Sequence, residues 1–336
     1  MYNKSIVASG HQYVSEAAAE ILAEGGNAFD AIAAAGFASA VAEPALTSLG
    51  GGGFMVGHST TAGEDVFFDF FVDSPGRGRK DDSLKSDFFA VTVNFSGSSQ
   101  DFNVGLGSVA VPGTLKGLLH IHRKLGHMPL NEVVRPAHEL ARGHRLNEQQ
   151  SHFLDLLRPI MTLTERGRQI FQPAGKYLEA GDSVENAALV GFLEQIVVEG
   201  DESFYHGELA QKIHMEMAEA GGLLTADDLR AYTVNERKPL KINYRDNVFL
   251  TTPEPSMGGT LIGLSLSLLA RQPKREYSWG SGEHLLTTLG LMKEVERLRG
   301  KGVTTPAALA RFLENDPQVS GSADNVRLFS RGTTHV

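Results

Sequence analysis

The chain of 336 residues contains no cysteine and a single tryptophan. The absence of cysteine excludes a disulfide framework and any metal site built on thiolates. It leaves the compartment open, because exported proteins can also lack cysteine. No apolar run approaches the roughly 18 residues that a membrane-spanning helix needs. The formal net charge of −9 argues against nucleic acid or an anionic membrane as the main partner.

The N-terminus also lacks the pattern of a secretory signal. Residues 1–9 lead directly into a strand-like run, with no basic region followed by a long apolar one. We therefore expect a cytoplasmic protein by default, and a periplasmic or extracellular location stays open.

The order of the predicted elements favours a layered α/β domain. Ser15 is expected to cap a helix that ends at Gly25, and Asn27 to cap an alanine-rich helix over 28–41. Strands are expected at 54–57 and 66–72, where β-branched and aromatic residues are frequent. Because strands gather near the two ends of the chain around a helical middle, a Rossmann fold is not favoured.

Two further local predictions follow from the middle of the sequence. Residues 73–104 are polar and charged with scattered glycines, which is typical of an exposed loop. Thr225 is followed three residues later by Asp228, which predicts a capping box at the start of a short helix.

Four consecutive glycines, Gly50–Gly53, precede the predicted strand 54–57. No Gly-Lys-Ser/Thr follows them, so a P-loop is excluded. A glycine loop that cradles phosphate would lead into a helix. Close packing of backbone against backbone is therefore the favoured interpretation, and a nucleotide-binding protein is not expected.

A metal site would have to come from histidines, and their spacing does not favour one. His120 and His122 lie two residues apart on a predicted helix, so they point to different sides. His127, His138 and His144 complete the group, but there is no His-Glu-x-x-His and the nearby carboxylates lack ligand spacing. We expect neither a metal nor an organic cofactor.

The sequence ends in Gly332-Thr333-Thr334-His335-Val336. A threonine hydroxyl can attack the carbonyl before it, and hydrolysis of the resulting ester leaves a threonine with a free α-amino group. With a pKa of about 8, that amine can deprotonate the hydroxyl of its own residue, which is one known form of nucleophilic catalysis. By itself such a cluster is an ordinary tail, and it gains meaning only from blocks far upstream.

Those blocks, taken in order with the tail, resemble the gamma-glutamyltranspeptidase family over most of the chain. They are Gly25-Gly26-Asn27-Ala28-Phe29-Asp30-Ala31, Glu43-Pro44, Leu49-Gly50-Gly51-Gly52-Gly53-Phe54, Val109-Ala110-Val111-Pro112-Gly113-Thr114, Gly126-His127-Met128-Pro129-Leu130, Phe204-Tyr205-His206-Gly207 and Pro255-Ser256-Met257-Gly258-Gly259. So many matches in the expected order are very unusual by chance.

The resemblance implies an N-terminal-nucleophile (Ntn) hydrolase with a four-layer αββα sandwich. Residues 1–336 would be a single large-subunit region that stops just after the self-cleavage bond between Gly332 and Thr333. Thr333 would be the nucleophile, and Thr334 would support its amine and hydroxyl. The partner would be the small-subunit segment of the same precursor, the substrate a small-molecule amide, and this portion alone would be inactive.

One departure from the family pattern concerns the substrate. Members that act on gamma-glutamyl compounds carry Asp-Phe-Arg-Glu, whose arginine holds the α-carboxylate, whereas this chain has Asp69-Phe70-Phe71-Val72. Phe71 thus replaces a bidentate guanidinium with an apolar ring, unless Arg77 or Arg79 compensates. A gamma-glutamyltransferase or glutathione hydrolase, a related acylase or small-amide hydrolase, and a non-catalytic large-subunit scaffold all stay open.

Overall fold

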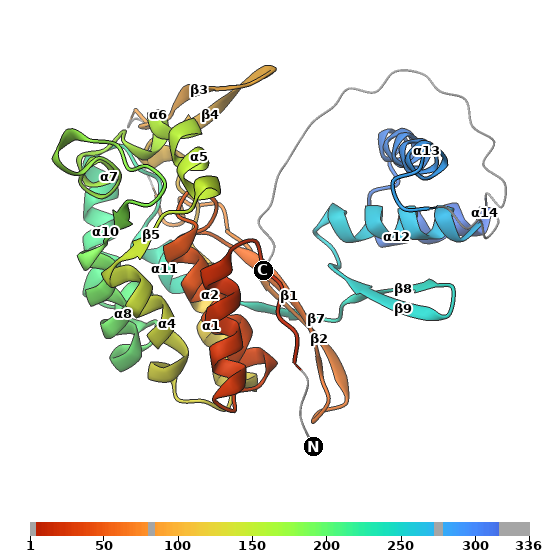
Figure 1. Cartoon of the computed structure of the whole chain (residues 1–336), viewed down its shortest axis with the longest axis horizontal. Helices are drawn as coiled ribbons and strands as arrows, with labels where there is room; N and C mark the ends of the chain where they lie inside the picture. The colour runs from red at the N-terminus through yellow and green to blue at the C-terminus, as the bar shows by residue number, and fades with distance from the viewer. Residues whose placement is uncertain (1–4, 80–84, 272–277, 316–336) are drawn as a thin grey trace. The chain divides into compact units, whose positions relative to one another are not determined.

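The computed structural model describes residues 5–79, 85–271 and 278–315. These residues form two compact units (Figure 1). The described part of the first unit falls within Met1–Gly53 and Phe70–Val234, and that of the second within Phe54–Asp69 and Asn235–Gly332.

The first unit is mainly helical. Its longer helices are α1 (Gln12–Ala23), α2 (Ala28–Ala42), α3 (Thr114–Leu125), α4 (Leu130–Arg142), α8 (Ala187–Glu199) and α10 (Glu208–Glu219). Its shorter elements are β3 (Phe89–Phe95), β4 (Ser98–Val104), η1 (Leu106–Ser108), β5 (His144–Arg145), α5 (Glu148–Leu156), α6 (Arg158–Met161), α7 (Glu165–Phe171), η2 (Pro173–Gly175), β6 (Ser183–Val184), α9 (Glu202–Tyr205) and α11 (Ala226–Ala231).

Helix α2 lies at the centre of this unit, packed against α1, α3 and α4. The Asn27 side chain accepts hydrogen bonds from the backbone N–H groups of Phe29 and Asp30, and the Asp30 carboxylate accepts one from Asn27, so the predicted N-cap is confirmed. Eleven of the fifteen residues of α2 are buried. Its alanines let the neighbouring helices approach closely from several sides.

Helix α1 begins earlier than the sequence indicates. Its N-cap is His11, whose Nδ1 accepts the Tyr13 N–H, and the predicted cap at Ser15 is wrong. The Ser15 hydroxyl instead lies 2.6 Å from the hydroxyl of Ser9. The helix ends as expected before Gly25, which adopts the left-handed φ of 100° that glycine tolerates.

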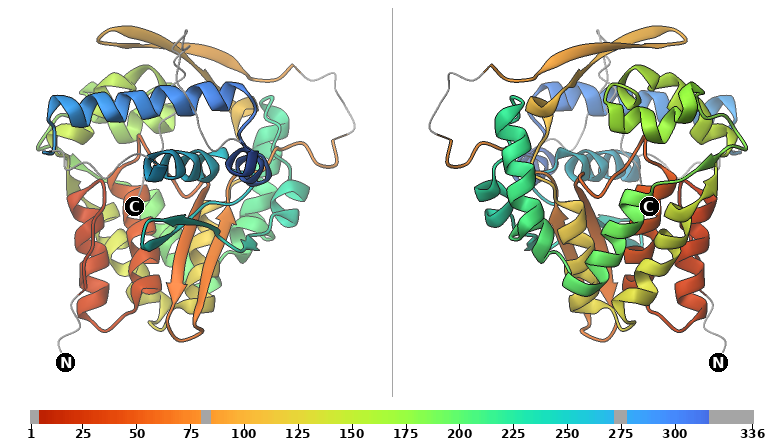
Figure 2. Two further views of the ribbon diagram at one scale, coloured as in Figure 1. Left: turned by 90° about the vertical axis from the view of Figure 1, so that its right-hand side faces the viewer. Right: turned by 90° about the vertical axis from the view of Figure 1, so that its left-hand side faces the viewer.

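The prediction of an exposed loop over residues 73–104 is also wrong, because its second half is the antiparallel hairpin β3–β4. Phe89 pairs with Val104 and Phe95 with Ser98. One face of the hairpin is apolar, and on it Val93 is 1% exposed, near α5 and α6. Figure 2 shows the hairpin, in orange, as a long ribbon along the upper edge of both views.

The second unit contains a three-stranded sheet in the order β1-β2-β7, a hairpin and three helices. These elements are β1 (Gly53–Ser59), β2 (Glu64–Phe70), β7 (Asn235–Arg237), β8 (Leu240–Tyr244), β9 (Asn247–Thr251), α12 (Met257–Arg271), α13 (Gly282–Gly300) and α14 (Pro306–Asn315). The strands expected at 54–57 and 66–72 are therefore confirmed as β1 and β2. A small core, which includes Ile242, Leu264 and Leu309, joins the hairpin to the helices.

The described residues are thus mixed α/β with small antiparallel sheets. Within the same residues, none of the helices combines the length and apolar character required to span a bilayer.

Candidate functional site

The residues predicted to carry the chemistry, Gly332, Thr333 and Thr334, lie outside the described residues. Phe71, which the sequence places at the substrate, is described, and so is the neighbouring glycine loop Gly50–Gly53, for which the sequence predicts close backbone packing. Both belong to the first unit.

The glycine loop packs directly against two other backbone segments. The Gly51 carbonyl accepts N–H groups from Gly113 at 2.8 Å and from Thr114 at 2.9 Å. A Cβ atom added to Gly52 would lie 2.5 Å from the backbone nitrogen of Val72. The predicted close packing of backbone is therefore confirmed, and these N–H groups at the start of α3 are already bonded to protein.

Phe71 follows directly after β2 and has an exposed side chain but a fixed backbone. The side chain is 51% exposed, which is unusual for a phenylalanine held next to a well-packed loop. The Phe71 carbonyl accepts a hydrogen bond from the Tyr232 hydroxyl at 2.9 Å. The apolar ring predicted from the sequence therefore lies at the protein surface.

Behind Phe71 lies a set of residues that we call the tyrosine–lysine network: the buried Tyr232, Tyr205 and Asp201, and the half-buried Lys116. Lys116 Nζ donates to the Tyr232 carbonyl at 3.1 Å, lies 4.3 Å from the centre of the Tyr205 ring and is 3.7 Å from an Asp201 carboxylate oxygen. Burial lowers the pKa of Lys116, an effect that Asp201 opposes. Burial also raises the pKa of Tyr205 above its usual value.

No local sequence pattern points to this network. Only Tyr205 belonged to a block that resembled the family, and nothing in that block indicated a role for it. Lys116 and Tyr232 are 116 residues apart, so no local pattern could bring them together.

Of the two arginines that could replace the missing guanidinium, Arg79 holds a turn through its side chain, whereas Arg77 takes part in that turn through its backbone. Arg79 donates to the Gly222 carbonyl at 2.6 Å. The backbone N–H groups of Gly76 and Arg77 donate to Asp228, each at 2.8 Å. Asp228 also bonds to Thr225, which confirms the predicted capping box. Arg79 is thus engaged in tying residues 76–79 to the segment that leads into α11.

Three of the histidines considered as metal ligands, His122, His138 and His144, each have a separate hydrogen-bond partner. His122 Nε2 lies 2.8 Å from the Met128 carbonyl, and His138 Nε2 lies 3.0 Å from Glu194. His144 Nδ1 lies 3.1 Å from the Leu140 carbonyl. Across residues 5–79, 85–271 and 278–315, no three His, Cys, Asp or Glu side chains are placed to hold a metal ion.

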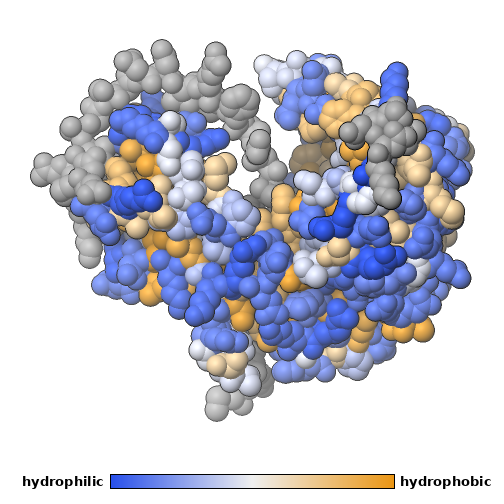
Figure 3. Space-filling view, turned by 180° about the vertical axis from the view of Figure 1, so that it is seen from behind, coloured by the Kyte–Doolittle hydropathy of each residue, from blue (hydrophilic) through white to orange (hydrophobic). Residues whose placement is uncertain are grey.

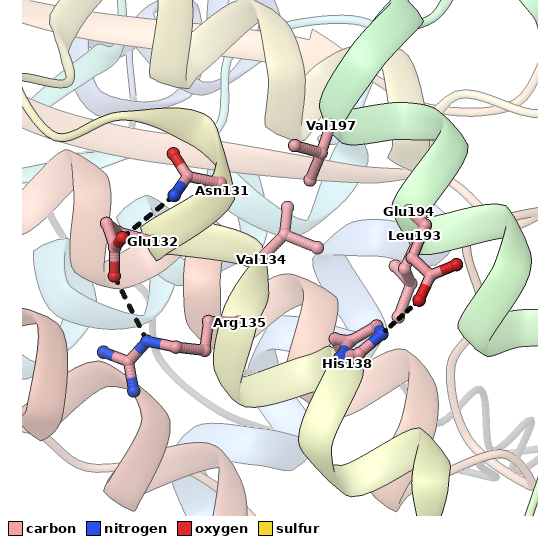
Figure 4. A pocket seen from close by; sticks show the side chains of 8 residues that line it. All are labelled: Asn131, Glu132, Val134, Arg135, His138, Leu193, Glu194 and Val197. Atoms are coloured by element: carbon pink, nitrogen blue, oxygen red, sulfur yellow. Dashed lines mark hydrogen bonds and ion pairs between the residues drawn. The ribbon is translucent and has the colours of Figure 1, made fainter.

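A pocket of about 370 Å³ lies between α4 and α8. Val134, Leu193 and Val197 supply its apolar lining, and Figure 4 shows its charged groups paired with one another. Arg135 bonds to Glu132, to Glu20 of α1 and to the C-cap residue Glu24, while His138 faces Glu194. Because these polar groups are hydrogen-bonded to one another, they are less available to a ligand. The Phe71 region is therefore the stronger candidate for a binding site.

A sequence model of the gamma-glutamyltranspeptidase family matches residues 14–315. The chain belongs to the gamma-glutamyltranspeptidase family. This match covers most of the chain and confirms the resemblance seen in the ordered sequence blocks.

Two curated relatives of this chain illustrate the range of activities named within the family. The glutathione hydrolase proenzyme of Escherichia coli K12 is 34% identical over 296 residues, which span 88% of this chain and 49% of the relative. The acylase ACY 1 proenzyme of Pseudomonas sp. strain V22 is 31% identical over 293 residues, which span 84% of this chain and 51% of the relative. The chain thus spans about half the length of these curated relatives.

Solved gamma-glutamyltranspeptidases share the fold. The Helicobacter pylori enzyme superposes with a TM-score of 0.74 at 29% identity, covering 88% of this chain and 83% of its own. The Pseudomonas nitroreducens enzyme in complex with L-DON gives a TM-score of 0.73 at 28% identity, covering 96% of this chain and 97% of its own.

Proposed function

We propose that this chain is the large-subunit region of an N-terminal-nucleophile amidase. Cleavage between Gly332 and Thr333 frees the Thr333 amine, which deprotonates the Thr333 hydroxyl. The oxygen attacks the amide carbonyl, the amine departs with a proton, and the acyl group passes to water or to a second amine. Thr334 supports the nucleophile by hydrogen bonding. The observation that carries this proposal is the family match over residues 14–315.

The proposal includes the rest of the family architecture. Residues 1–336 form one large-subunit region of a four-layer αββα sandwich, completed by the small-subunit segment of the same precursor. Two observations support this partner. The relatives are named proenzymes and are about twice as long, and α13 in the second unit has a broadly exposed apolar face.

That face consists of residues at helical spacing, each at least half exposed: Leu285, Leu286, Leu289 and Met292. Figure 3 shows apolar surface on the second unit among polar residues. Helices with such a stripe are normally covered by another element. We propose that the small-subunit segment, which corresponds to the half of the relatives that this chain does not span, covers this face.

Within this amidase class, Phe71 favours acyl groups that lack an α-carboxylate. Its exposed ring provides apolar contact where gamma-glutamyl-specific members present an arginine, and Arg79 is bonded to the Gly222 carbonyl. An acylase or small-amide hydrolase is therefore favoured over a glutathione hydrolase. Both classes occur among the relatives, with acylase ACY 1 proenzyme at 31% identity and the Escherichia coli glutathione hydrolase proenzyme at 34%, so this choice rests on Phe71.

Cleavage and turnover in the full-length gene product test the nucleophile. We expect the wild type to mature into two pieces and to hydrolyse amides, whereas Thr333→Ala stays intact and inactive. Thr61→Ala, which changes an exposed threonine in the turn after β1, is the matched control and should behave as wild type. Maturation and turnover by Thr333→Ala would refute the proposal.

A set of p-nitroanilides tests the acyl group. The gamma-glutamyl derivative carries an α-carboxylate and an α-amine, the glutaryl derivative keeps the equivalent carboxylate without the amine, and a simple fatty-acyl derivative has neither. We expect the wild type to prefer the fatty-acyl derivative, and Phe71→Arg to shift the preference toward the two carboxylate-bearing derivatives by about tenfold. A wild type that already prefers gamma-glutamyl amides would contradict the role given to Phe71.

A further inference from the structure

Tyr232 is fixed at both ends although it lies in the irregular segment after α11. Its hydroxyl donates to the Phe71 carbonyl at 2.9 Å, and its own carbonyl accepts from Lys116 Nζ at 3.1 Å. The residue is only 2% exposed. Tyr232 is therefore too deeply buried to touch a substrate, whereas the residue it holds is half exposed.

The hydroxyl of Tyr232 reaches Phe71 through a gap that only glycine leaves open. A Cβ atom on Gly113 would lie 2.2 Å from this hydroxyl and 2.0 Å from the Phe70 carbonyl. The Gly113 N–H in turn donates to Gly51. The hydroxyl thus lies where the segment around Phe71, the start of α3 and the glycine loop meet.

The ring of Tyr232 is held by the rest of the tyrosine–lysine network. It stacks on Tyr205 with ring centres 6.0 Å apart and an interplanar angle of 20°. The Tyr205 hydroxyl donates to the Pro112 carbonyl at 2.9 Å. Lys116 lies against the Tyr205 ring and near Asp201, which compensates its charge. Each polar end of both tyrosines is thereby satisfied inside the protein.

We propose that Tyr232 is a positioning residue for acyl-group recognition, which it exerts by fixing the backbone of Phe71. This inference rests on the proposed amidase function. Holding the Phe71 carbonyl sets the direction in which the Phe71 ring leaves the chain. The ring then forms a fixed apolar wall, and the acyl groups that fit it carry aliphatic or aromatic atoms in place of the charged end of a gamma-glutamyl group.

The first test needs no catalysis. Trp279 is the single tryptophan and is 91% exposed, so Trp279→Phe with Phe71→Trp places one fluorescent indole at the wall. Adding Tyr232→Phe should increase quenching by acrylamide and lower the anisotropy. Adding Tyr205→Phe, which releases the Pro112 carbonyl and not that of Phe71, should leave both close to the parent. Equal quenching and anisotropy with and without the Tyr232 hydroxyl would overturn the inference.

The second test uses the full-length protein and a fatty-acyl p-nitroanilide. Losing one hydrogen bond to the Phe71 carbonyl should raise KM in Tyr232→Phe by about fivefold, with a smaller change in kcat. Thermal unfolding of each variant checks that it is folded. In Tyr232→Phe, the ratio of kcat/KM for the fatty-acyl p-nitroanilide to that for gamma-glutamyl p-nitroanilide should fall by the same factor. In Tyr205→Phe this ratio should stay at the wild-type value.

The outcomes separate this inference from the proposed function. A wild type that cleaves none of the amides removes the amidase proposal and the acyl-recognition role with it. An active wild type whose acyl preference survives Tyr232→Phe leaves the amidase standing and overturns the role of Tyr232.

Discussion

Helices α2 and α13 are both rich in apolar residues, yet they differ in how many of their residues are buried. Eleven of fifteen residues are buried in α2, whereas Leu298 alone is buried in α13. Helix α2 finds its neighbours within the first unit, and α13 presents an apolar stripe to solvent. This contrast is what the proposed small-subunit partner requires, because α13 keeps exposed the apolar side chains that such a partner would cover.

The largest expected effect is on stability in the first unit. Phe37 in α2 is fully buried, and Phe37→Ala should cost about 3–5 kcal/mol of unfolding free energy because it leaves a cavity. Leu286 in α13 is 71% exposed, and Leu286→Ala should change it by no more than about 0.5 kcal/mol. Urea unfolding of both variants measures the difference. Equal losses of unfolding free energy in the two variants would show that α2 and α13 do not differ in burial.

Addition of the proposed small-subunit segment should cover the apolar face of α13. If the separately expressed downstream segment binds the folded chain, a concentration one hundred times the Kd should add about 2.7 kcal/mol of stability. Hydrogen exchange should slow in α13 and hardly change in α2. Leu286→Asp should weaken this binding, and protection of α13 that is unchanged by the segment would contradict its role as an interface.

The first turns of the two helices offer a smaller contrast. Asp30 is fully buried and accepts backbone N–H groups from both Asn27 and His127. Asp30→Ala should therefore cost about 2 kcal/mol. Glu283, at the start of α13, is exposed, and Glu283→Ala should cost about 0.5 kcal/mol or less. Thermal or urea unfolding gives both values, and comparable losses would show that Asp30 has no special role.

A pH effect should appear in the first unit. Burial lowers the pKa of His11, and nearby His144 lowers it further. Because the unfolded state then binds more protons, the stability from His11 is complete above a pH of about 6.5 and falls as the pH drops below it. Glu43 acts in the opposite direction, since burial raises its pKa.

His11→Asn removes the contribution of His11 alone, since asparagine can keep the cap of α1 and leaves in place both Glu43 and His144, whose pKa burial also lowers. Urea unfolding between about pH 7.5 and 5.5 should show a steeper loss of stability in the wild type than in this variant. Parallel pH profiles would contradict the assignment.

The sequence predicts best what is local. The alanine run and Asn27 predict α2, and the spacing of Thr225 and Asp228 predicts the cap of α11, because each depends on contacts within one turn. The hairpin β3–β4 was missed because Val93 is buried by helices distant in sequence. The bond from Tyr232 to Phe71 joins residues 161 apart. Only the family resemblance, and no local pattern, points to Thr333.

The most direct test of the account is intact mass spectrometry of the full-length gene product, incubated with a fatty-acyl p-nitroanilide and quenched in acid. We predict two pieces separated between Gly332 and Thr333, with the acyl mass added to the piece that begins at Thr333. An uncut chain that still releases p-nitroaniline, or an acyl group attached elsewhere, would contradict the central claim.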